Sequence, residues 1–306
     1  MGRQVPRAKV IVNPVAGAKS TRRLWPKIDR LLKHVGLSFD AQFTEGQGHA
    51  VELAREAAGD GYRYVVAVGG DGTVHEVANG IMESSGARDT TLGVISTGTG
   101  GDFVRSIGVP RQYVPACSAL MSRHRSRIDV GVVEFMNKGQ KLRRFFVNAA
   151  GLGFDAAVAE STERLPKYFG GTIPYVFGLV RTLAGYRNKN VVLRMGDTIE
   201  KLRIVTIVVA NGGYYGGGMH VAPDADLRDG RLDLMIVKDM GKIALLKAFP
   251  RVYKGTHVTH PKVSMSKLSE IVIDTSEPVL VHADGELVGE GPASFHILPG
   301  ALTLAV

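Results

Sequence analysis

The sequence has almost no cysteine. Among its 306 residues only Cys117 is a cysteine, which excludes an intramolecular disulfide and leaves no set of thiolates for a zinc site. The nine histidines offer no substitute, because no two of them lie four residues apart in a clear helical pattern. We therefore expect a protein of a reducing compartment, the cytoplasm, without a structural zinc ion.

Long hydrophobic runs are also missing. The longest uncharged stretch, residues 204–219, is shorter than the ~20 residues that a membrane-spanning helix needs, and glycines interrupt it. The apolar run near the N-terminus is too short for a signal peptide. We expect neither a leader nor a transmembrane helix.

Acidic residues are fewer than basic residues. Asp and Glu number 29 against 38 Lys and Arg, which gives a net charge of +9. Such an excess attracts nucleotide phosphates, nucleic acid or the anionic face of a membrane. The basic residues are scattered, so each small cluster is equally typical of an ordinary solvated surface. With 44% hydrophobic and 22% charged residues, the composition is that of a folded globular enzyme.

The hydrophobic pattern divides the chain in two. Up to residue 127, strand-like runs alternate with helix-like runs, which predicts a parallel α/β sheet; from residue 128 on, short β-branched runs dominate. We therefore predict an α/β protein of two domains, residues 1–127 and residues 128–306. In the first domain we expect strands at 9–13, 39–44, 64–68 and 92–95 and helices at 24–35, 50–58 and 74–82. In the second we expect strands at 145–149, 191–195, 202–210, 232–237, 270–274, 279–283 and 293–298 and helices at 174–186 and 242–253.

The strongest local signal is GGDGT at residues 69–73, between an apolar strand and an amphipathic helix. Glycines let the backbone approach a phosphate, and the helix N-terminus offers free N–H groups to the anion. The alternative is a tight turn in which Asp71 and Thr73 only cap the helix. In either case we expect Asp71 to be exposed at the helix start and to contribute little to stability.

A second glycine-rich loop, residues 96–103 (STGTGGDF), follows the next expected strand. Loops at the carboxyl ends of neighbouring parallel strands face one crevice. Neither loop matches the dinucleotide pattern GxGxxG or contains a P-loop lysine, and no GxSxG elbow is present. Hydride transfer with a nicotinamide cofactor and α/β-hydrolase chemistry are therefore unsupported.

Two acidic segments of the second half have two interpretations each. Asp224, Asp226, Asp229 and Asp233 surround a Gly230 turn, a pattern that suits either an oxygen-ligated Mg²⁺ or Ca²⁺ or a solvated turn between strands. Asp-Gly-Glu at residues 284–286 reads as a hairpin turn, or as two carboxylates placed for catalysis.

Several of these segments together resemble the diacylglycerol kinase catalytic domain family, in particular its bacterial soluble lipid kinases. The resemblance spans nearly the whole chain. It is carried by NPVAG (13–17), GGDGTVHEVANG (69–80), GTGGDF (98–103), RIDVG (127–131), NAAGLGFDAAV (148–158), NGGYYGGGMHVAPDADLRDGRLDL (211–234) and HADGE (282–286). It implies an α/β nucleotide-binding domain similar to those of NAD kinases and 6-phosphofructokinases, followed by a β-rich domain.

The resemblance also implies roles for individual residues. A structural Mg²⁺ is implied at the carboxylates of Asp226 and Asp229 and the carbonyl of Arg231, with Asp129 linking this metal to the nucleotide site. Asp284 or Glu286 is implied as the general base, and Asp71 is the alternative catalytic aspartate. The implied ATP contacts are Asn13, Pro14, Val15, Ala16, Gly17, Thr44, Gly70, Asp71, Gly72, Thr73, Val74, His75, Glu76 and Thr99.

The sequence departs from the family pattern at one position of the second loop. Gly101 stands where the family has asparagine before the aspartate, which removes an amide side chain from the implied nucleotide pocket. The chain also ends soon after ALTLAV, which leaves little room for the C-terminal helix that many members return to the first domain.

From these features we predict an ATP- and Mg²⁺-dependent kinase that phosphorylates a lipid hydroxyl at a membrane surface. Which lipid it uses is not readable from the sequence. A NAD kinase, a non-catalytic lipid-binding protein on a kinase scaffold and, on net charge alone, a nucleic-acid binder are the alternatives; we expect no nucleic-acid partner. Residues 168–186, rich in aromatics and flanked by cations, form either a core helix or a lip that dips into the inner face of the membrane.

Overall fold

The computed structural model describes residues 8–122, 124–163 and 181–306, and the chain divides into two compact units. Unit 1 comprises Met1–Ile128 together with Gly300–Val306, and unit 2 comprises Asp129–Pro299. The expectation that everything after residue 127 forms one domain is wrong for Gly300–Val306. The end of the last strand adds to the sheet of unit 1, where Thr303 and Leu304 pair with Thr91 and Leu92.

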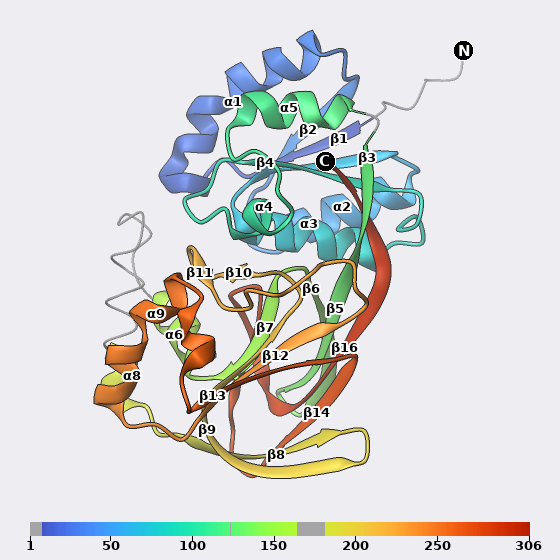
Figure 1. Cartoon of the computed structure of the whole chain (residues 1–306). Coiled ribbons are helices and arrows are strands. Elements are labelled where there is room, and N and C mark those ends of the chain that lie inside the picture. The colour runs from blue at the N-terminus through green and yellow to red at the C-terminus, as the bar shows by residue number, and fades with distance from the viewer. Residues whose placement is uncertain (1–7, 123, 164–180) are drawn as a thin grey trace. The chain divides into compact units, whose positions relative to one another are not determined.

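Unit 1 is built on a parallel sheet (Figure 1). Its strands are β1 (Ala8–Val12), β2 (Phe39–Phe43), β3 (Tyr64–Gly69) and β4 (Thr91–Ser96), joined by the end of β16 (Glu286–Ala305). They lie in the order β2-β1-β3-β4-β16. Because β3 is buried along most of its length, it needs the continuous apolar run that the sequence provides.

Helices cover both faces of this sheet (Figure 1). On one face, Ile28 and Leu32 of α1 and Cys117 of α5 pack in one core with Val10 and Val66 of the strands. On the other face lie α2 and α3. The bounds are α1 (Ala16–His34), α2 (His49–Gly59), α3 (Asp71–Glu83), α4 (Asp102–Ser106) and α5 (Tyr113–Met121). The last two have no counterpart among the expected helices, since they are short and α5 is apolar on more than one side.

Unit 2 is a β-rich body in which six strands close on themselves. The pairings run β9-β7-β15-β16-β14-β8 and return to β9. Leu152, Leu193, Ile207 and Phe295 belong to the buried core of this unit. The strands are β5 (Arg125–Asn137), β6 (Gln140–Phe146), β7 (Ala149–Gly153), β8 (Lys189–Met195), β9 (Thr198–Ala210), β10 (Tyr214–Tyr215), β11 (Met219–His220), β12 (Leu232–Lys238), β13 (Val263–Leu268), β14 (Glu270–Thr275), β15 (Leu280–Ala283) and β16.

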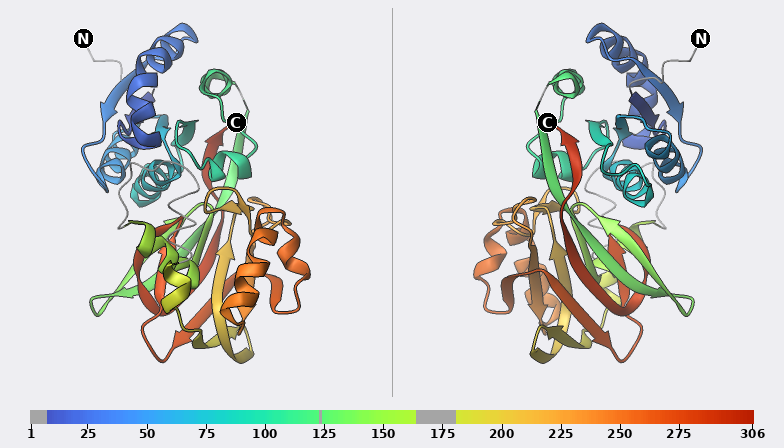
Figure 2. Two further views of the ribbon diagram at one scale, coloured as in Figure 1. Left: turned by 90° about the vertical axis from the view of Figure 1, so that its left-hand side faces the viewer. Right: turned by 90° about the vertical axis from the view of Figure 1, so that its right-hand side faces the viewer.

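Helices pack on the outer face of the β9-β12-β13 part of unit 2. Met235 and Val237 of β12 form one core with the partly buried Leu245 and Phe249. Figure 2 shows the helices of residues 242–253 lying beside the strands of this unit. The helix expected at 242–253 is divided into α8 (Lys242–Ala248) and α9 (Pro250–Tyr253), because Pro250 lacks the N–H that would continue the first helix. Unit 2 also contains α6 (Phe154–Glu163) and the short 3₁₀ helix η1 (Thr256–Thr259).

One further expectation differs from the structure, and another lies mostly outside the described residues. The strand expected at 145–149 is the end of β6 and the start of β7, with Val147 and Asn148 between them. Most of the helix expected at 174–186, and most of the lip at 168–186, lies outside the described residues; the described residues 181–185 are helical. In the described ranges, no helix combines the length and the apolar character that crossing a membrane requires.

Candidate nucleotide and phosphoryl-transfer site

Unit 1 gathers the expected nucleotide residues at the carboxyl ends of β1, β3 and β4. These strands are parallel neighbours, so the loops that follow them lie along one edge of the sheet. Asn13, directly after β1, donates from Nδ2 to Thr73 Oγ1 at 2.9 Å. The N–H of Thr97, after β4, donates to the carbonyl of Gly69 at 2.8 Å. The NPVAG segment and the two glycine-rich loops therefore form one structure, as the sequence predicts.

The two glycine-rich loops touch through backbone. A Cβ added to Gly98 would lie 2.6 Å from the Cα of Gly70, closer than such atoms approach. In the same way, a Cβ on Gly17 would lie 2.3 Å from the carbonyl oxygen of Thr97, and Gly17 has a φ of 58°. These two glycines are needed for close approach and, at Gly17, also for the left-handed conformation.

Asp71 joins the two loops through its carboxylate. Oδ2 accepts the N–H of Gly101 at 2.8 Å and Oδ1 accepts the N–H of Phe103 at 3.1 Å. Burial raises the pKa of Asp71, and the nearby charge of Asp102 raises it further, while the backbone hydrogen bonds oppose both. The expectation that Asp71 is an exposed loop residue is therefore wrong: it is half-buried and holds the second loop in place.

The start of α3 is open to an anion. Gly70 is its N-cap and makes no side-chain hydrogen bond to the helix. Gly72 is exposed, and a Cβ there would meet nothing within 4 Å. With Asp71 turned to the second loop, the N–H groups and the positive end of the helix dipole are the groups that this 13-residue helix offers at its N-terminus.

The remaining expected nucleotide residues differ in what they can offer. Val74 and His75 are 2% and 1% exposed, so neither offers its side chain to a ligand. Glu76 Oε2 accepts the N–H of Ala50 at 3.1 Å, at the start of α2. Thr44 is buried after β2, whereas Thr99 is exposed in the second loop. Pro14 and Val15 lie in the turn between β1 and α1, and Ala16 is the first residue of α1.

Gly101 has a conformational reason to be glycine. It is the N-cap of α4 with a φ of 65°, the left-handed region. Besides glycine, asparagine is among the residues that adopt this region most readily, so the exchange between the family asparagine and Gly101 preserves the backbone. A Cβ here would lie 2.9 Å from Nε of Arg111, the end of a flexible side chain.

In unit 2, Asp284 anchors the junction between β6 and β7. Oδ2 accepts the N–H of Val147 at 2.9 Å, and Oδ1 accepts those of Asn148 at 2.8 Å and Ala149 at 3.0 Å. Asp284 itself has a φ of 49° and lies in the expected hairpin turn, where Ala283 pairs with Glu286. The DGE segment is therefore a tight turn between β15 and β16, and the placement of its two carboxylates for catalysis stays a prediction.

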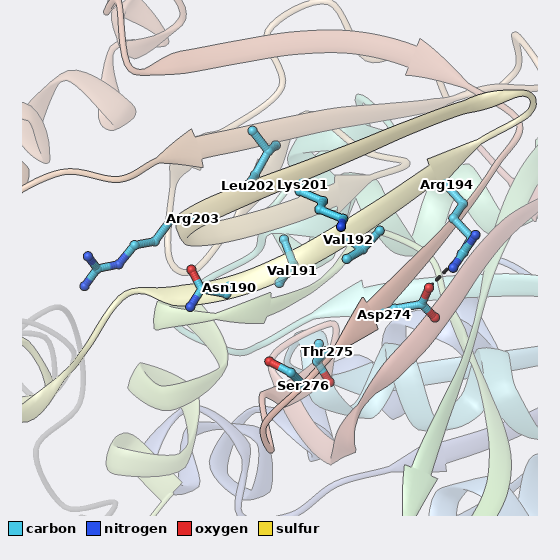
Figure 3. A pocket seen from close by; sticks show the side chains of 10 residues that line it. All are labelled: Asn190, Val191, Val192, Arg194, Lys201, Leu202, Arg203, Asp274, Thr275 and Ser276. Atoms are coloured by element: carbon cyan, nitrogen blue, oxygen red, sulfur yellow. Dashed lines mark hydrogen bonds and ion pairs between the residues drawn. The ribbon is translucent and has the colours of Figure 1, made fainter.

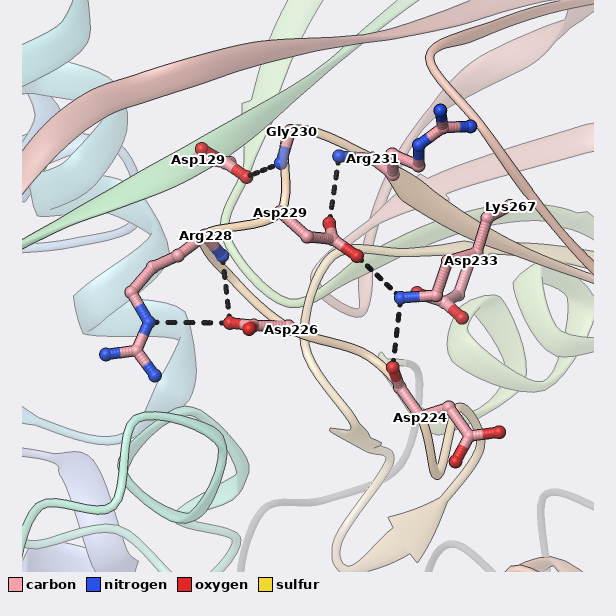
Figure 4. Close-up of polar contacts among 9 residues, drawn as sticks. All are labelled: Asp129, Asp224, Asp226, Arg228, Asp229, Gly230, Arg231, Asp233 and Lys267. Atoms are coloured by element: carbon pink, nitrogen blue, oxygen red, sulfur yellow. Dashed lines mark hydrogen bonds and ion pairs between the residues drawn. The ribbon is translucent and has the colours of Figure 1, made fainter.

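The acidic loop is also held from β5. Asp129 is 2% exposed and accepts the N–H of Gly230 on Oδ2 at 2.7 Å, while its own N–H donates to the carbonyl of Leu227 at 2.7 Å (Figure 4). Each of the two expected metal-ligand carboxylates also folds back on its own loop. Asp226 accepts the N–H of Arg228, and Asp229 accepts the N–H of Arg231.

Lys267 of β13 is a residue of this loop region that the sequence analysis missed. Its Nζ lies 2.6 Å from Asp229 Oδ2 and 3.5 Å from Asp233 Oδ2, and it donates to the carbonyl of Asp224 at 3.0 Å (Figure 4). The hydrogen bond to Asp229 raises the pKa of the Lys267 ammonium. Lys267 pairs with Asp233 across the β12–β13 ladder, so only the strand register would have revealed it.

The donor chemistry of this loop suits a divalent cation only in part. Carboxylate and carbonyl oxygens are the ligands that Mg²⁺ prefers. However, a lysine ammonium already neutralises Asp229, and Arg228 Nε lies 3.4 Å from Asp226. Over the described parts of the chain, no group of three or more His, Cys, Asp or Glu side chains is placed to hold a metal ion. The Mg²⁺ site at Asp226, Asp229 and Arg231 stays a prediction.

A cavity of about 620 Å³ lies elsewhere on unit 2, over β8, β9 and β14 (Figure 3). Arg194 and Asp274, paired at 2.7 Å, lie on one side of it, and Lys201 and Arg203 line it as well. None of the expected site residues lines this cavity.

Comparison with known proteins accounts for both units. The sequence model of the diacylglycerol kinase catalytic domain matches residues 7–133, and that of the YegS C-terminal NAD kinase beta sandwich-like domain matches residues 148–306. The chain thus combines a diacylglycerol kinase catalytic domain with a YegS C-terminal domain, and it belongs to the family of the second, whose model spans more than half of its residues. The fold expected from the sequence, an α/β domain followed by a β-rich domain, is confirmed.

Relatives in this family match along nearly the whole chain. The diacylglycerol kinase of Staphylococcus carnosus (strain TM300) is 29% identical over 94% of this chain and 91% of its own length. That of Bacillus subtilis (strain 168) is 29% identical over 94% of this chain and 92% of its own. These relationships support a lipid kinase.

Crystal structures of two Bacillus anthracis str. Sterne proteins share the fold. One has a TM-score of 0.79 and 27% identity, and it covers 99% of this chain and 98% of its own. The other, of a diacylglycerol kinase, has a TM-score of 0.72 and 23% identity with the same coverage.

Proposed function

We propose that this family member transfers the γ-phosphoryl group of ATP to the hydroxyl of a diacylglycerol-like lipid, with Mg²⁺ accompanying the nucleotide. The observation that carries the proposal is the joined pair of glycine-rich loops at the carboxyl ends of β3 and β4, tied together by Asp71. The relationship to diacylglycerol kinases supports the chemistry, and this arrangement of loops supports the binding of a triphosphate.

The residues of unit 1 suit the phosphates by chemistry and by space. The uncapped start of α3 offers N–H groups, and Gly72, where a Cβ would meet nothing within 4 Å, lets a ligand approach the backbone. Asn13, whose amide is oriented by a hydrogen bond to the buried Thr73, offers a polar side chain beside that loop. The role of these groups would be to bind and orient the nucleotide, since phosphoryl transfer depends mostly on position and charge.

Proton acceptance falls to a carboxylate. We assign it to Asp284 or Glu286, with Asp71 as the alternative, because the lipid hydroxyl must lose its proton as its oxygen bonds to phosphorus. The three N–H groups on Asp284 tie up lone pairs on both of its oxygens, which favours an anchoring role for Asp284 and leaves Glu286 as the acceptor to test first. Mg²⁺, when bound with the nucleotide, neutralises phosphate charge.

The second, structural Mg²⁺ site is proposed at Asp226, Asp229 and the carbonyl of Arg231. Asp129 would connect that site to the nucleotide. In support, Asp129 holds Gly230, between the two residues Asp229 and Arg231, by a hydrogen bond of 2.7 Å.

The substrate class implies work at a bilayer surface. We propose that the chain associates peripherally with anionic membranes, supported by its net charge of +9. Binding to vesicles that contain anionic lipid, strong in low salt and reversed in high salt, would agree with this; equal binding to neutral vesicles would contradict it.

The decisive experiment is phosphorylation with labelled ATP. The protein is incubated with Mg²⁺ and a panel of dispersed lipids: diacylglycerol, monoacylglycerol, a sphingoid base and phosphatidylglycerol. We expect label in diacylglycerol or a close analogue. Label transferred to NAD in a parallel reaction would identify a NAD kinase, and hydrolysis or transfer to no acceptor would contradict a kinase.

A further inference from the structure

A fully buried histidine lies directly behind the turn that carries Asp284 and Glu286. His282 of β15 is 0% exposed, and its Nε2 lies 2.8 Å from Oδ2 of Asp155, at the start of α6. Both residues belong to unit 2. The mechanism above assigns neither of them a task.

Two hydrogen bonds besides the one to His282 orient the carboxylate of Asp155. Oδ1 accepts the hydroxyl of Thr206 at 2.6 Å and the N–H of Ala156 at 2.8 Å. Oδ2 is thereby directed to His282, whose Nε2 must be the donor of this hydrogen bond. The other ring nitrogen, Nδ1, accepts the N–H of Gly285 at 3.3 Å. The imidazole therefore connects a fixed carboxylate to the middle residue of the turn.

The surrounding side chains prevent the ring from turning. Tyr215 stacks on it with centroids 5.0 Å apart and planes within 12°. On β7, a Cβ added to Gly151 would lie 2.5 Å from Asp155 Oδ2 and 3.2 Å from His282 Nε2. At this position of β7 the absence of a side chain leaves room for the pair.

The turn is held from both sides. Asp284 has a φ of 49° and Gly285 a φ of 88°, the left-handed pair that an Asp-Gly hairpin turn uses. Asp284 is held from one side by three backbone N–H groups, and Gly285 is held from the other side by His282. An error in this turn would displace the first residue of β16, Glu286, as well as Asp284.

We propose that the buried Asp155–His282 pair is a positioning device for the Asp284–Glu286 turn. It acts through the hydrogen bond from Gly285 to Nδ1. The proposal rests on the proposed function, because it needs the carboxylates of that turn to serve the phosphoryl transfer.

The ring of His282 makes two hydrogen bonds, and two variants each keep a different one of them. Asparagine places its Oδ1 near the position of Nδ1, so His282→Asn keeps the acceptor for Gly285 and loses the donor to Asp155. Glutamine reaches the position of Nε2, so His282→Gln keeps the donor and loses the acceptor. We expect His282→Asn to lose stability but keep kcat within ~3-fold, and His282→Gln to lose kcat by about 10-fold or more with little change in the KM for ATP.

His257 provides a matched control. It is also a buried histidine of unit 2, 3% exposed, and its Nε2 lies 3.0 Å from the carbonyl oxygen of Val221, outside the turn. His257→Gln should lower the melting temperature and leave kcat unchanged. If both His282 variants lose kcat only in proportion to their loss of stability, as a destabilised control would, the pair is structural and the proposal is overturned.

A measurement without lipid separates this proposal from the proposed function. Hydrogen exchange should show a protected amide at Gly285 in the wild type and in His282→Asn, and faster exchange in His282→Gln. A wild type that phosphorylates no lipid but shows this pattern overturns the function alone. Equal exchange of Gly285 in all three proteins overturns the positioning role, whatever the activity.

Discussion

The carboxylate of Asp71 accepts a hydrogen bond from the main-chain N–H of Gly101 at 2.8 Å, so a side chain of the loop after β3 holds the loop after β4 in place. A residue that the sequence suggests for chemistry thus also stabilises the fold of the site. We expect Asp71→Ala to reduce lipid phosphorylation by at least ~100-fold. We also expect it to lower the free energy of unfolding by about 2 kcal/mol, because two backbone N–H groups lose a charged acceptor.

Activity and urea unfolding of the same preparation test this prediction. Asp89→Ala is a suitable control, since Asp89 is an exposed aspartate of the same unit. More than about a tenth of wild-type turnover in Asp71→Ala would remove the catalytic role. Unchanged stability would remove the structural one.

The raised pKa of Asp71 predicts a pH dependence of stability. Burial makes the folded chain bind this proton more tightly than the unfolded chain does. Between the unfolded pKa of about 3.9 and the higher folded pKa, the stability contributed by Asp71 therefore falls as pH rises. Asp71→Asn lacks this titration.

Unfolding free energies of the wild type and Asp71→Asn across the acidic range give the comparison. The difference, wild type minus variant, should decrease with rising pH and become constant above the folded pKa of Asp71. A difference that increases with pH would show that the hydrogen bonds from Gly101 and Phe103 outweigh burial.

Gly101 allows a test of conformation against side-chain chemistry. Because its φ is 65°, Gly101→Ala should cost about 1 kcal/mol of stability, whereas Gly101→Asn should cost less. If the amide contributes to nucleotide binding, Gly101→Asn also lowers the KM for ATP. An unchanged KM would mean that backbone groups already make the contact. Equal destabilisation by alanine and asparagine would mean that the limited space beside Arg111, and not the backbone conformation, causes the loss of stability.

Lys267 makes the proposed structural Mg²⁺ site testable. If Mg²⁺ binds at Asp226 and Asp229, it competes with the Lys267 ammonium 2.6 Å from Asp229. Mg²⁺ should raise the melting temperature of the wild type, and it should raise that of Lys267→Met by more. Asp229→Ala should abolish the shift. No Mg²⁺-dependent shift in the wild type or in Lys267→Met would leave these carboxylates as turn residues with protein counter-ions.

Asp284 and Glu286 can be separated by isosteric amides. An asparagine at 284 tolerates the left-handed φ. However, its NH₂ group would face a backbone N–H that donates to the carboxylate in the wild type, so two donors would oppose each other. Asp284→Asn should therefore lose stability by about 2 kcal/mol. Glu286→Gln should keep its melting temperature and lose activity by ~100-fold. Full activity of Glu286→Gln, together with a folded but inactive Asp284→Asn, would identify Asp284 as the base.

Much of unit 1 could be predicted from the sequence because its signals are local. A buried parallel strand such as β3 needs a continuous apolar run, and a loop that approaches a phosphate needs glycines, so residues 64–73 show both features in order. The same holds for the hairpin turn at Asp284 and Gly285. Motifs of this kind were also enough to reveal the family.

Long-range pairing was decided only by the tertiary structure. Nothing in ALTLAV indicates that this segment returns to β4, because a short apolar strand can join any sheet with an open edge. Asp71 looks exposed in its own loop, but the N–H groups that donate to its carboxylate belong to Gly101 and Phe103, about thirty residues further along the chain. Lys267 meets Asp229, and His282 meets Asp155, only after strand register and packing bring them together. The sequence by itself determined which residue types and turns are present; which charges and hydrogen bonds they share depends on contacts between distant segments, and local propensity does not encode these.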